Sequence, residues 1–317
     1  MLQIVLGAIM LGLLWAVMTI GVYITYRILG IADLSVEGSI TTGAAIAAHC
    51  IYTGMNPYLA TFLALLGGMA AGLITGLLHT KLKIPALLSG ILTMIALYSI
   101  NLRILGKSNL SLLRMDTVYT VFKESSLVNN PLFVRLNIAH QLPAIILGII
   151  CVLAIVTILY WFFGTEIGCS IRATGDNPQM ARAQGINTNN MIILGLIISN
   201  GLVALSGALI AQQQSFADIQ MGIGSIVIGL ASVIIGEVLF GRRSFYSRLM
   251  SLVFGAITYR LIIALVLKMG MPANDLKLFT AITVAAALAL PTFRSYLRPL
   301  TKSMKGGAVD AVNKRNS

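Results

Sequence analysis

The chain has 317 residues, of which 57% are hydrophobic and 10% are charged, and its mean hydropathy is +0.91. A water-soluble domain of this length cannot bury so much apolar surface, so a soluble globular protein is excluded and we expect lipid around the chain. The formal net charge of +12 is attributed to membrane topology and contact with anionic lipid, and we expect no nucleic-acid partner.

Apolar windows of about 20 residues predict helices that span a hydrocarbon core about 30 Å thick. The predicted spans are 1–26, 37–53, 57–79, 84–105, 140–163, 190–214, 223–240, 246–267 and 276–292. Window 37–53 is the weakest because it is rich in Gly, Ala and Thr, and a broken or re-entrant helix is the alternative there. The predicted fold class is therefore an all-α, polytopic integral membrane protein with about nine spans, eight and ten being the alternatives.

The chain divides into a transmembrane domain, 1–295, and a basic tail, 296–317. A polar loop, 164–189, interrupts the transmembrane domain near its middle. The first window lacks a basic leader and a small-residue cleavage site, so we expect it to be retained. The three cysteines show no CxxC spacing, and we expect neither a disulfide framework nor a metal site or cofactor.

The positive-inside rule orients the chain if loop 164–189 is cytoplasmic. Fourteen basic residues then face inside: Arg27, Lys81, Lys83, Arg172, Arg182, Arg242, Arg243, Arg248, Arg294, Arg298, Lys302, Lys305, Lys314 and Arg315. Seven face outside: Arg103, Lys107, Arg114, Lys123, Arg135, Lys268 and Lys277. We therefore predict a multi-pass protein of the cell (inner or plasma) membrane with a cytoplasmic C-terminus and, for an odd number of spans, an outside N-terminus.

Two segments of the chain are similar to each other. Residues 31–45 and 216–231 both run Ala-Asp-aliphatic, then Gly-Ser-Ile, then a Gly three residues on. Because the predicted topology puts them on opposite faces, they indicate an inverted repeat around a midplane path. We expect Asp33 and Asp218 at equivalent corners, each capping a following helix. Chance similarity between Gly-rich segments is the alternative.

Glycines in window 57–79 recur at helical spacing. Gly67, Gly68, Gly72 and Gly76 predict close packing against another helix, with a dimer interface as the alternative use.

The polar loop contains signals for one short helix. Asn177 followed by Pro178 predicts its start, and Gly185 predicts a left-handed stop. The helix, Pro178 to Gln184, is predicted to present Met180, Ala181 and Ala183 with Arg182 alongside. Thr188 is the expected cap of the next span. A capped helix with small and flexible apolar side chains fits a groove on another protein, whereas a solvated connector, the alternative, needs neither the caps nor the length.

These residues resemble a known family. The segments 165–168, 171–173, 175–178, Ala181 and 185–186 resemble the cytoplasmic loop of permeases in the branched-chain amino acid and ribose branch of ABC importers. Segments 31–43, 206–208 and 229–243 also follow that pattern, and the resemblance extends over about 17–291. Two departures leave the substrate class open: Glu37 stands where sugar-type relatives often carry Gly, and Gly236-Glu237-Val238 replaces a more glycine-rich stretch.

The resemblance implies a membrane subunit that pairs into a dimer, most simply a homodimer, around a translocation path. It implies that an extracytoplasmic solute-binding protein delivers the solute and that a cytoplasmic ATP-binding subunit drives transport. The helix from Pro178 to Gly185 would be the coupling helix seated in that ATPase. The predicted coupling residues are Arg172, Asp176, Asn177, Pro178, Met180, Ala181, Arg182 and Gly185.

The translocation path is predicted from polar residues in or near the spans. The candidates are Asp33, Ser39, Thr42, Asn200, Asp218, Ser225 and Arg260, followed by Thr41, Asn101 and Ser206. Interhelical hydrogen bonding is the alternative for each. Arg260 either snorkels outward past Leu267 or faces the path and attracts a substrate carboxylate. The outer segment 106–139 is the expected surface for the binding protein, with a disordered loop as the alternative.

The sequence favours a transport subunit over an enzyme. Gly106-Lys107-Ser108 is no phosphate loop, because residue 101 is Asn where that motif needs Gly. The rival hypothesis is an ion-coupled secondary transporter, which would keep acids at bilayer depth. Asp33, Asp218 and Glu237 are predicted near span ends, which favours ATP drive, and a passive channel or scaffold would have no use for the capped helix. We therefore predict an ABC importer permease for a small hydrophilic solute, an amino acid (an aromatic one among the options), with a sugar or nucleoside as the alternative.

Overall fold

The computed structural model describes residues 2–123, 142–241 and 244–268, together with residues 278, 281, 282, 284, 285 and 289. Within this part of the chain, six helices are long and apolar enough to cross a membrane. They are α1 (Leu2–Tyr23, continued by the π-helix η1, Ile24–Ile28), α3 (Pro57–Thr80), α4 (Ala86–Leu105), α7 (Leu142–Gly164), α10 (Thr188–Gln214) and α12 (Phe245–Lys268).

Two further helices occupy predicted spans but are shorter. They are α2 (Ser35–Tyr52), which is continuous rather than broken, and α11 (Ser225–Phe240). The all-α, polytopic fold class is therefore confirmed, but the count of nine spans is not. The ninth window, 276–292, lies largely outside the described residues, and the tail 296–317 lies wholly outside them.

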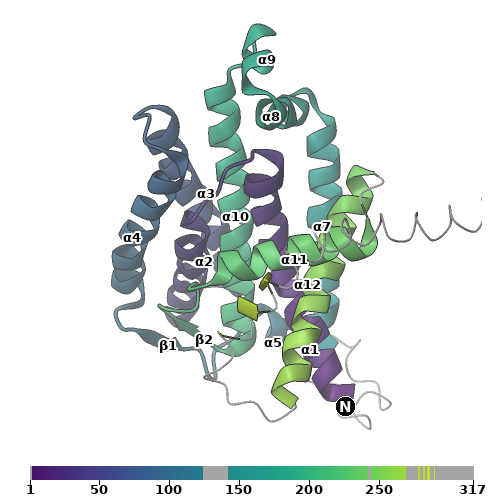
Figure 1. Cartoon of the computed structure of the whole chain (residues 1–317). Coiled ribbons are helices and arrows are strands. Elements are labelled where there is room, and N and C mark those ends of the chain that lie inside the picture. Colours follow the sequence, from purple (N-terminus) through teal and green to yellow (C-terminus); the bar gives the residue numbers. More distant parts are fainter. Residues whose placement is uncertain are drawn as a thin grey trace, which may run out of the picture.

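The bundle has two distinct ends (Figure 1). At one, the polar loop forms two helices, α8 (Glu166–Asp176) and α9 (Pro178–Ala183); we call this the α9 end. At the other, β1 (Asn109–Ser111) pairs antiparallel with β2 (Phe216–Asp218), and α5 (Val118–Lys123) lies nearby. We call this the ribbon end. The chain begins there, at the start of α1 (Figure 1).

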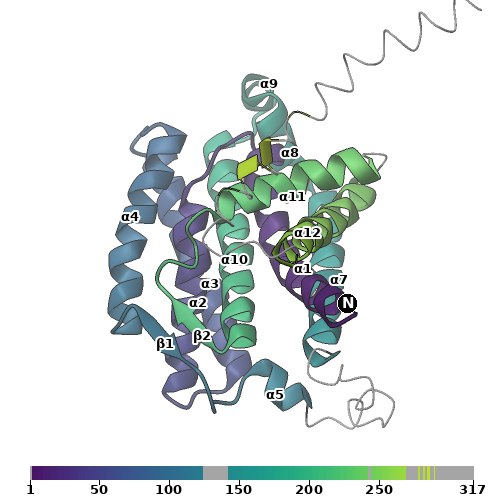
Figure 2. The same cartoon turned by 60° about the horizontal axis from the view of Figure 1, so that its bottom comes forward.

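Helix α10 lies in the centre of the bundle and packs against α1, α2 and α3, as Figures 1 and 2 both show. Glycines make these contacts close. A Cβ on Gly72 of α3 would meet the backbone of Leu196, and one on Gly43 of α2 would meet the backbone of Ala204. Lipid tails are as apolar as the side chains, so the hydrophobic effect does not drive helices together inside a membrane. Close van der Waals packing of this kind is instead a main source of helix association. The predicted glycine face of α3 is thus confirmed, and it packs on α10.

The similar segments each lie where one long helix leads into a second helix. Helix α1 leads to the α9 end and α2 runs back toward the ribbon end, whereas α10 leads to the ribbon end and α11 then crosses the bundle sideways (Figures 1 and 2). The segments also touch, since Gly224 N–H donates to Glu37 Oε1 at 2.9 Å. The prediction that the repeat puts Asp33 and Asp218 at equivalent corners is therefore wrong, because Asp33 is buried against Asn200 of α10 whereas Asp218 lies in β2 at the ribbon end.

The two predicted caps behave differently. Asp33 Oδ1 accepts from the backbone N–H of Ser35, the first residue of α2, at 2.9 Å. Asp218 Oδ1 accepts from Gln220 N–H at 2.6 Å, but α11 begins only at Ser225, after Gly224 with φ +81°. The prediction that Asp218 caps a helix is therefore wrong, because the segment 219–224 separates it from α11.

We predict that Gly207→Ala destabilises the bundle. A Cβ there would meet the carbonyl of Ile40 in α2, and relieving such overpacking costs about 1–3 kcal/mol. A thermal unfolding assay on the detergent-purified protein should show a lower Tm for Gly207→Ala. The matched control is Gly164→Ala at the end of α7, where a Cβ meets nothing within 4 Å. Equal Tm values for the two variants would contradict the packing described here.

Candidate functional site

The polar loop holds one more helix than predicted. α8 begins after Thr165, whose Oγ1 accepts from Gly168 N–H at 3.3 Å. It buries Gly168, Ile171 and Thr174 against the bundle. The sequence does carry a signal for α8: the N-cap Thr165 is followed by small and apolar residues that recur every three positions.

Helix α9 begins and ends as predicted, to within one residue. Asn177 Oδ1 accepts from Met180 N–H at 3.0 Å, Pro178 occupies the first turn, and Gly185 has φ +84°. The side chain of Met180 is 56% exposed. Ala181, however, is only 2% exposed, so the prediction that α9 presents it is wrong. Ala181 faces the bundle, whereas Met180 and Ala183 are exposed as predicted.

A second correction concerns the start of α10. Its cap is Asn187, whose Oδ1 accepts from Asn190 N–H at 3.3 Å, and not Thr188. Thr188 Oγ1 instead accepts from Arg182 Nε at 2.8 Å. Arg182 therefore fastens α9 to α10.

Arg172 and Asp176 have different surroundings. Arg172 Nη2 donates to the carbonyl of Phe163 at 2.9 Å, and its guanidinium lies 5.4 Å from the ring centre of Phe245. Arg172 thus joins α8 to the end of α7 and the start of α12. Asp176, the last residue of α8, is exposed.

Helix α8 lies directly on η1. A Cβ on Gly175 would meet the backbone of Ile28 and Leu29, so only glycine permits this approach. The π-helix η1 is itself an uncommon element that is frequent at functional sites. It leads into residues 29–34, which connect to α2. Movement of α8 would therefore act first on this connection.

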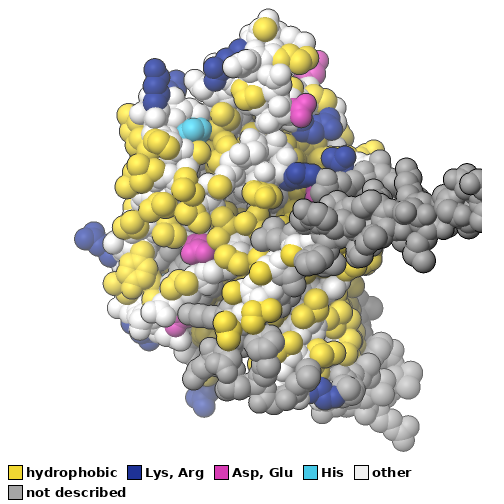
Figure 3. All heavy atoms as spheres, in the orientation of Figure 1, with side chains coloured by type: hydrophobic (Ala, Val, Ile, Leu, Met, Phe, Trp, Pro, Cys, Tyr) yellow, Lys and Arg dark blue, Asp and Glu magenta, His cyan; other side chains and the backbone are white. Residues whose placement is uncertain are grey.

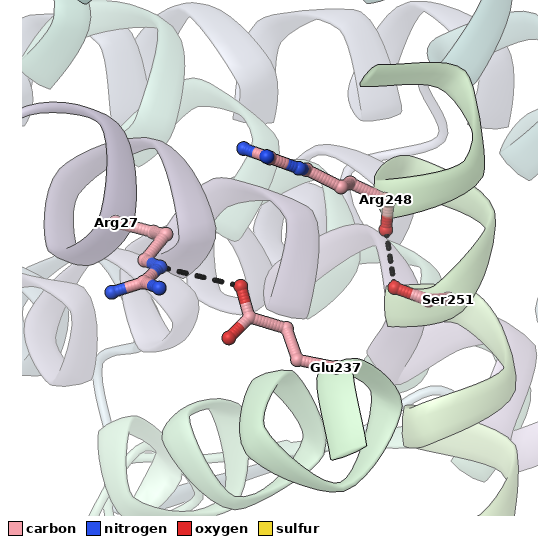
Figure 4. Close-up of polar contacts among 4 residues, drawn as sticks. All are labelled: Arg27, Glu237, Arg248 and Ser251. Carbon is pink, nitrogen blue, oxygen red and sulfur yellow. Dashed lines mark hydrogen bonds and ion pairs between the residues drawn. The ribbon is translucent and has the colours of Figure 1, made fainter. Parts of the chain in front are cut away.

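A cavity of about 730 Å³ opens between η1, α8 and the start of α12. Three arginines, Arg27, Arg172 and Arg248, line it. Arg27 Nε lies 3.3 Å from Glu237 Oε1 of α11, and Arg248 extends from α12 above this pair (Figure 4). This ion pair joins residues 210 positions apart in the sequence, and no local signal predicts it.

A buried polar network lies at the centre of the bundle. Asp33 Oδ1 accepts from Ser35 Oγ at 2.5 Å, and Asp33 Oδ2 accepts from Asn200 Nδ2 at 2.9 Å. Ser39 Oγ donates to Asn200 Oδ1 at 2.6 Å. Asn200 lies near the middle of α10. We call Asp33, Ser35, Ser39 and Asn200 the central network; the sequence analysis had named all of these except Ser35 as path candidates.

The position of Asp33 corrects the sequence analysis. Asp33 was predicted at a span edge, but it is 2% exposed and lies against the middle of α10. Helix α4 covers it from the other side, where a Cβ on Gly90 would meet the backbone N of Leu34 and, at 3.2 Å, Asp33 Oδ1. The sequence argument that no acid lies deep in the bundle is therefore wrong.

The other path candidates do not join the central network. Thr42 Oγ1 donates to the carbonyl of Gly38 in its own helix at 2.9 Å. Asp218 lies in β2 at the ribbon end, and Ser225 is buried at the start of α11. The guanidinium carbon of Arg260 lies 4.1 Å from the ring centre of Trp15. Arg260 therefore packs toward α1 by a cation–π contact instead of snorkelling past Leu267.

We predict that Asn200→Ala lowers the stability of the protein by about 1–3 kcal/mol, because Asp33 Oδ2 then loses its donor inside the bundle. Thermal unfolding of Asn200→Ala, Asp33→Ala and the double variant measures how strongly these two side chains contribute jointly to stability. The double variant should cost less than the sum of the single variants. Asn190→Ala, an exposed position in the same helix, is the control. Strict additivity would show that the two side chains do not support each other.

An all-α bundle of membrane-spanning length, with a structured polar loop at one end and a polar network at its centre, is typical of the membrane subunits of transporters. Residues 4–287 match the family model described as branched-chain amino acid transport system / permease component, and the chain belongs to this family. The protein is thus a multi-pass permease subunit of an ABC importer.

Curated relatives agree with this assignment. The tyrosine transport system permease protein of Clostridioides difficile (strain R20291) is 42% identical over 278 residues, which are 88% of each chain. An uncharacterized protein of Rickettsia prowazekii (strain Madrid E) is 31% identical over 296 residues, covering 90% of this chain and 97% of that one. The autoinducer 2 import system permease protein LsrC of Photorhabdus luminescens is 31% identical over 187 residues, covering 58% of this chain and 51% of the relative.

Proposed function

We propose that the protein carries a small hydrophilic solute, an amino acid, into the cell, and that a separate cytoplasmic ATPase seated on α9 drives it. An extracytoplasmic binding protein delivers the solute at the ribbon end, and a second copy of the permease completes the path. The observation that carries this proposal is the contact of α8 with η1, because it joins an ordered surface helix to the connection that holds Asp33.

Three contacts make the α8–α9 segment a stiff lever. Gly175 rests on the backbone at Ile28, Arg182 is bonded to Thr188, and Arg172 is bonded to the carbonyl of Phe163. A force on α9 therefore reaches η1, α10 and α7 together. Closure of the ATPases on ATP would stabilise one arrangement of these helices over the other, which is how binding energy shifts a conformational equilibrium.

The proposed orientation places the α9 end in the cytoplasm. The basic residues of this end that the structure describes are Arg27, Lys81, Lys83, Arg172, Arg182 and Arg248. Those of the ribbon end are Arg103, Lys107, Arg114, Lys123 and Lys268. The two ends therefore differ little in their number of described basic residues. The proposed orientation depends mainly on the basic tail, 296–317, which we place in the cytoplasm as part of this proposal.

Support for an amino acid comes from the relative in Clostridioides difficile, whose name gives tyrosine transport and which matches over most of both chains. The relative named for autoinducer 2 import matches over about half its length, and it keeps a sugar-like solute as the alternative. The buried Asp33 is the observation that would favour an ion-coupled carrier instead. Its carboxylate is already satisfied by Ser35 and Asn200, which favours a structural role.

We predict that Met180→Asp releases the ATPase. The new charge would lie on the exposed apolar surface of α9 and would have to be desolvated in the groove of the partner. Affinity purification of the permease should recover at least about tenfold less ATPase than with the wild type, because the cost of desolvating the charge weakens the binding of the ATPase. Met55→Asp is the matched control, since Met55 is an exposed methionine in the turn between α2 and α3 at the ribbon end. Undiminished recovery with Met180→Asp would contradict the proposed role of α9.

We also predict the sidedness of the bundle. In a background without the three native cysteines, Met180→Cys should react with a membrane-impermeant maleimide in inside-out vesicles only. Leu113→Cys, at the exposed ribbon end, should react in right-side-out vesicles only. The reverse pattern would place α9 outside the cell, where no ATPase could reach it.

A further inference from the structure

A second cavity, separate from the one lined by arginines, lies between α2, α4 and the segment that joins β2 to α11. Its volume is about 480 Å³, within the range of roughly 300–1,000 Å³ that is typical of small-molecule sites. Its walls include Glu37, Tyr98 and Asn101, together with apolar side chains from α4 and from the segment 219–223. We call it the Glu37 cavity.

Among the described residues, the Glu37 cavity contains a carboxylate but no cation that pairs with it. Gly224 N–H donates to Glu37 Oε1 at 2.9 Å, but a neutral amide leaves the negative charge in place. None of the residues that line the cavity is basic, and the ion pair that the described residues show joins Arg27 to Glu237 instead. An acid at bilayer depth is costly and tends to be functional. The cavity therefore favours a ligand that brings a positive charge.

Two further groups in the Glu37 cavity complement such a charge. Asn101 is buried, and within the described residues its Oδ1 has no hydrogen-bond partner. This oxygen can accept from a second N–H of an ammonium group. Tyr98 of α4 is 50% exposed, and its ring face can attract a cation or stack on an aromatic group. Met94, Ile95, Ile219 and Ile223 supply apolar surface for the rest of a ligand.

The Glu37 cavity lies at the depth of the central network. Glu37 stands between Ser35 and Ser39 on α2, so a rise of 1.5 Å per residue puts it within about 3 Å of both along the helix axis. In the orientation of Figure 1, the space-filling view shows acidic atoms surrounded by hydrophobic ones between α4 and α11 (Figure 3). A ligand held here would therefore lie about midway between the two ends of the bundle.

We propose that the Glu37 cavity binds an amino acid, with Glu37 and Asn101 receiving its ammonium group and Tyr98 contacting its side chain. This inference rests on the proposed function, since it names the residues that bind the solute of the proposed transporter. It also gives a role to the hydrogen bond between Gly224 and Glu37: α2 and the segment that leads into α11 both line the cavity, so a shift of either would change its shape and release the ligand.

The test is direct binding to the purified permease–ATPase complex without the binding protein, which would otherwise select the solute. Saturation-transfer NMR compares L-tyrosine with 3-(4-hydroxyphenyl)propionate, which lacks the amine, and with D-ribose. The wild-type complex should bind L-tyrosine at least about tenfold more tightly than the other two ligands, because both of them lack the positively charged ammonium group that Glu37 would bind. Glu37→Gln should abolish this preference, since glutamine keeps the acceptor for Gly224 but loses the charge, and Glu37→Asp should retain it.

Three results would each overturn the inference: equal binding of L-tyrosine and its amine-free analogue, an unchanged preference in Glu37→Gln, or tighter binding of D-ribose. Should Glu37→Gln fail to fold, the comparison of the three ligands on the wild type still decides. Failure of the proposed function looks different, because then no ATPase co-purifies with the permease or uptake proceeds without ATP.

Discussion

Hydrocarbon offers no hydrogen bonds, so a polar group that is buried in a membrane protein is costly unless other groups of the protein satisfy it. The carboxylate of Asp33, which is 2% exposed, is such a group. Ser35 and Asn200 satisfy it, and in doing so they fix the start of α2 against the middle of α10. The position of α2 then sets the position of Glu37, of the cavity beside it and, through Gly224, of α11.

The same constraint links the surface of the protein to its centre. Residues 29–34 have η1 and α8 on one side and the central network on the other. Because glycine at position 175 lets α8 touch the backbone of η1, no flexible side chain lies between the lever and the connection it acts on. A displacement of α9 by a partner would therefore be transmitted through η1 to residues 29–34, since close-packed interiors transmit strain. The fold thus contains a short series of contacts from α9 through α8 and η1 to the central network, which is the route by which the proposed ATPase would act on the solute.

Much of this architecture could be predicted from the sequence because its signals are local. Apolar windows located the helices, and Asn177-Pro178 and Gly185 located α9, since capping needs only neighbouring residues. Contacts between distant segments could not be predicted in this way. The burial of Asp33 depends on Asn200, the burial of Ala181 depends on how α9 lies on the bundle, and the tie from Glu37 to Gly224 depends on α11 returning to α2.

The central claim is that the α8–α9 segment moves when the ATPase binds ATP. Pulsed electron paramagnetic resonance can measure this in the assembled complex, with spin labels at Gln179 in α9 and at Leu82 in the exposed turn between α3 and α4. The account predicts that the distance between the labels changes when ATP is trapped, and that it does not change in the permease alone. An unchanged distance in a complex that still transports its solute would contradict it.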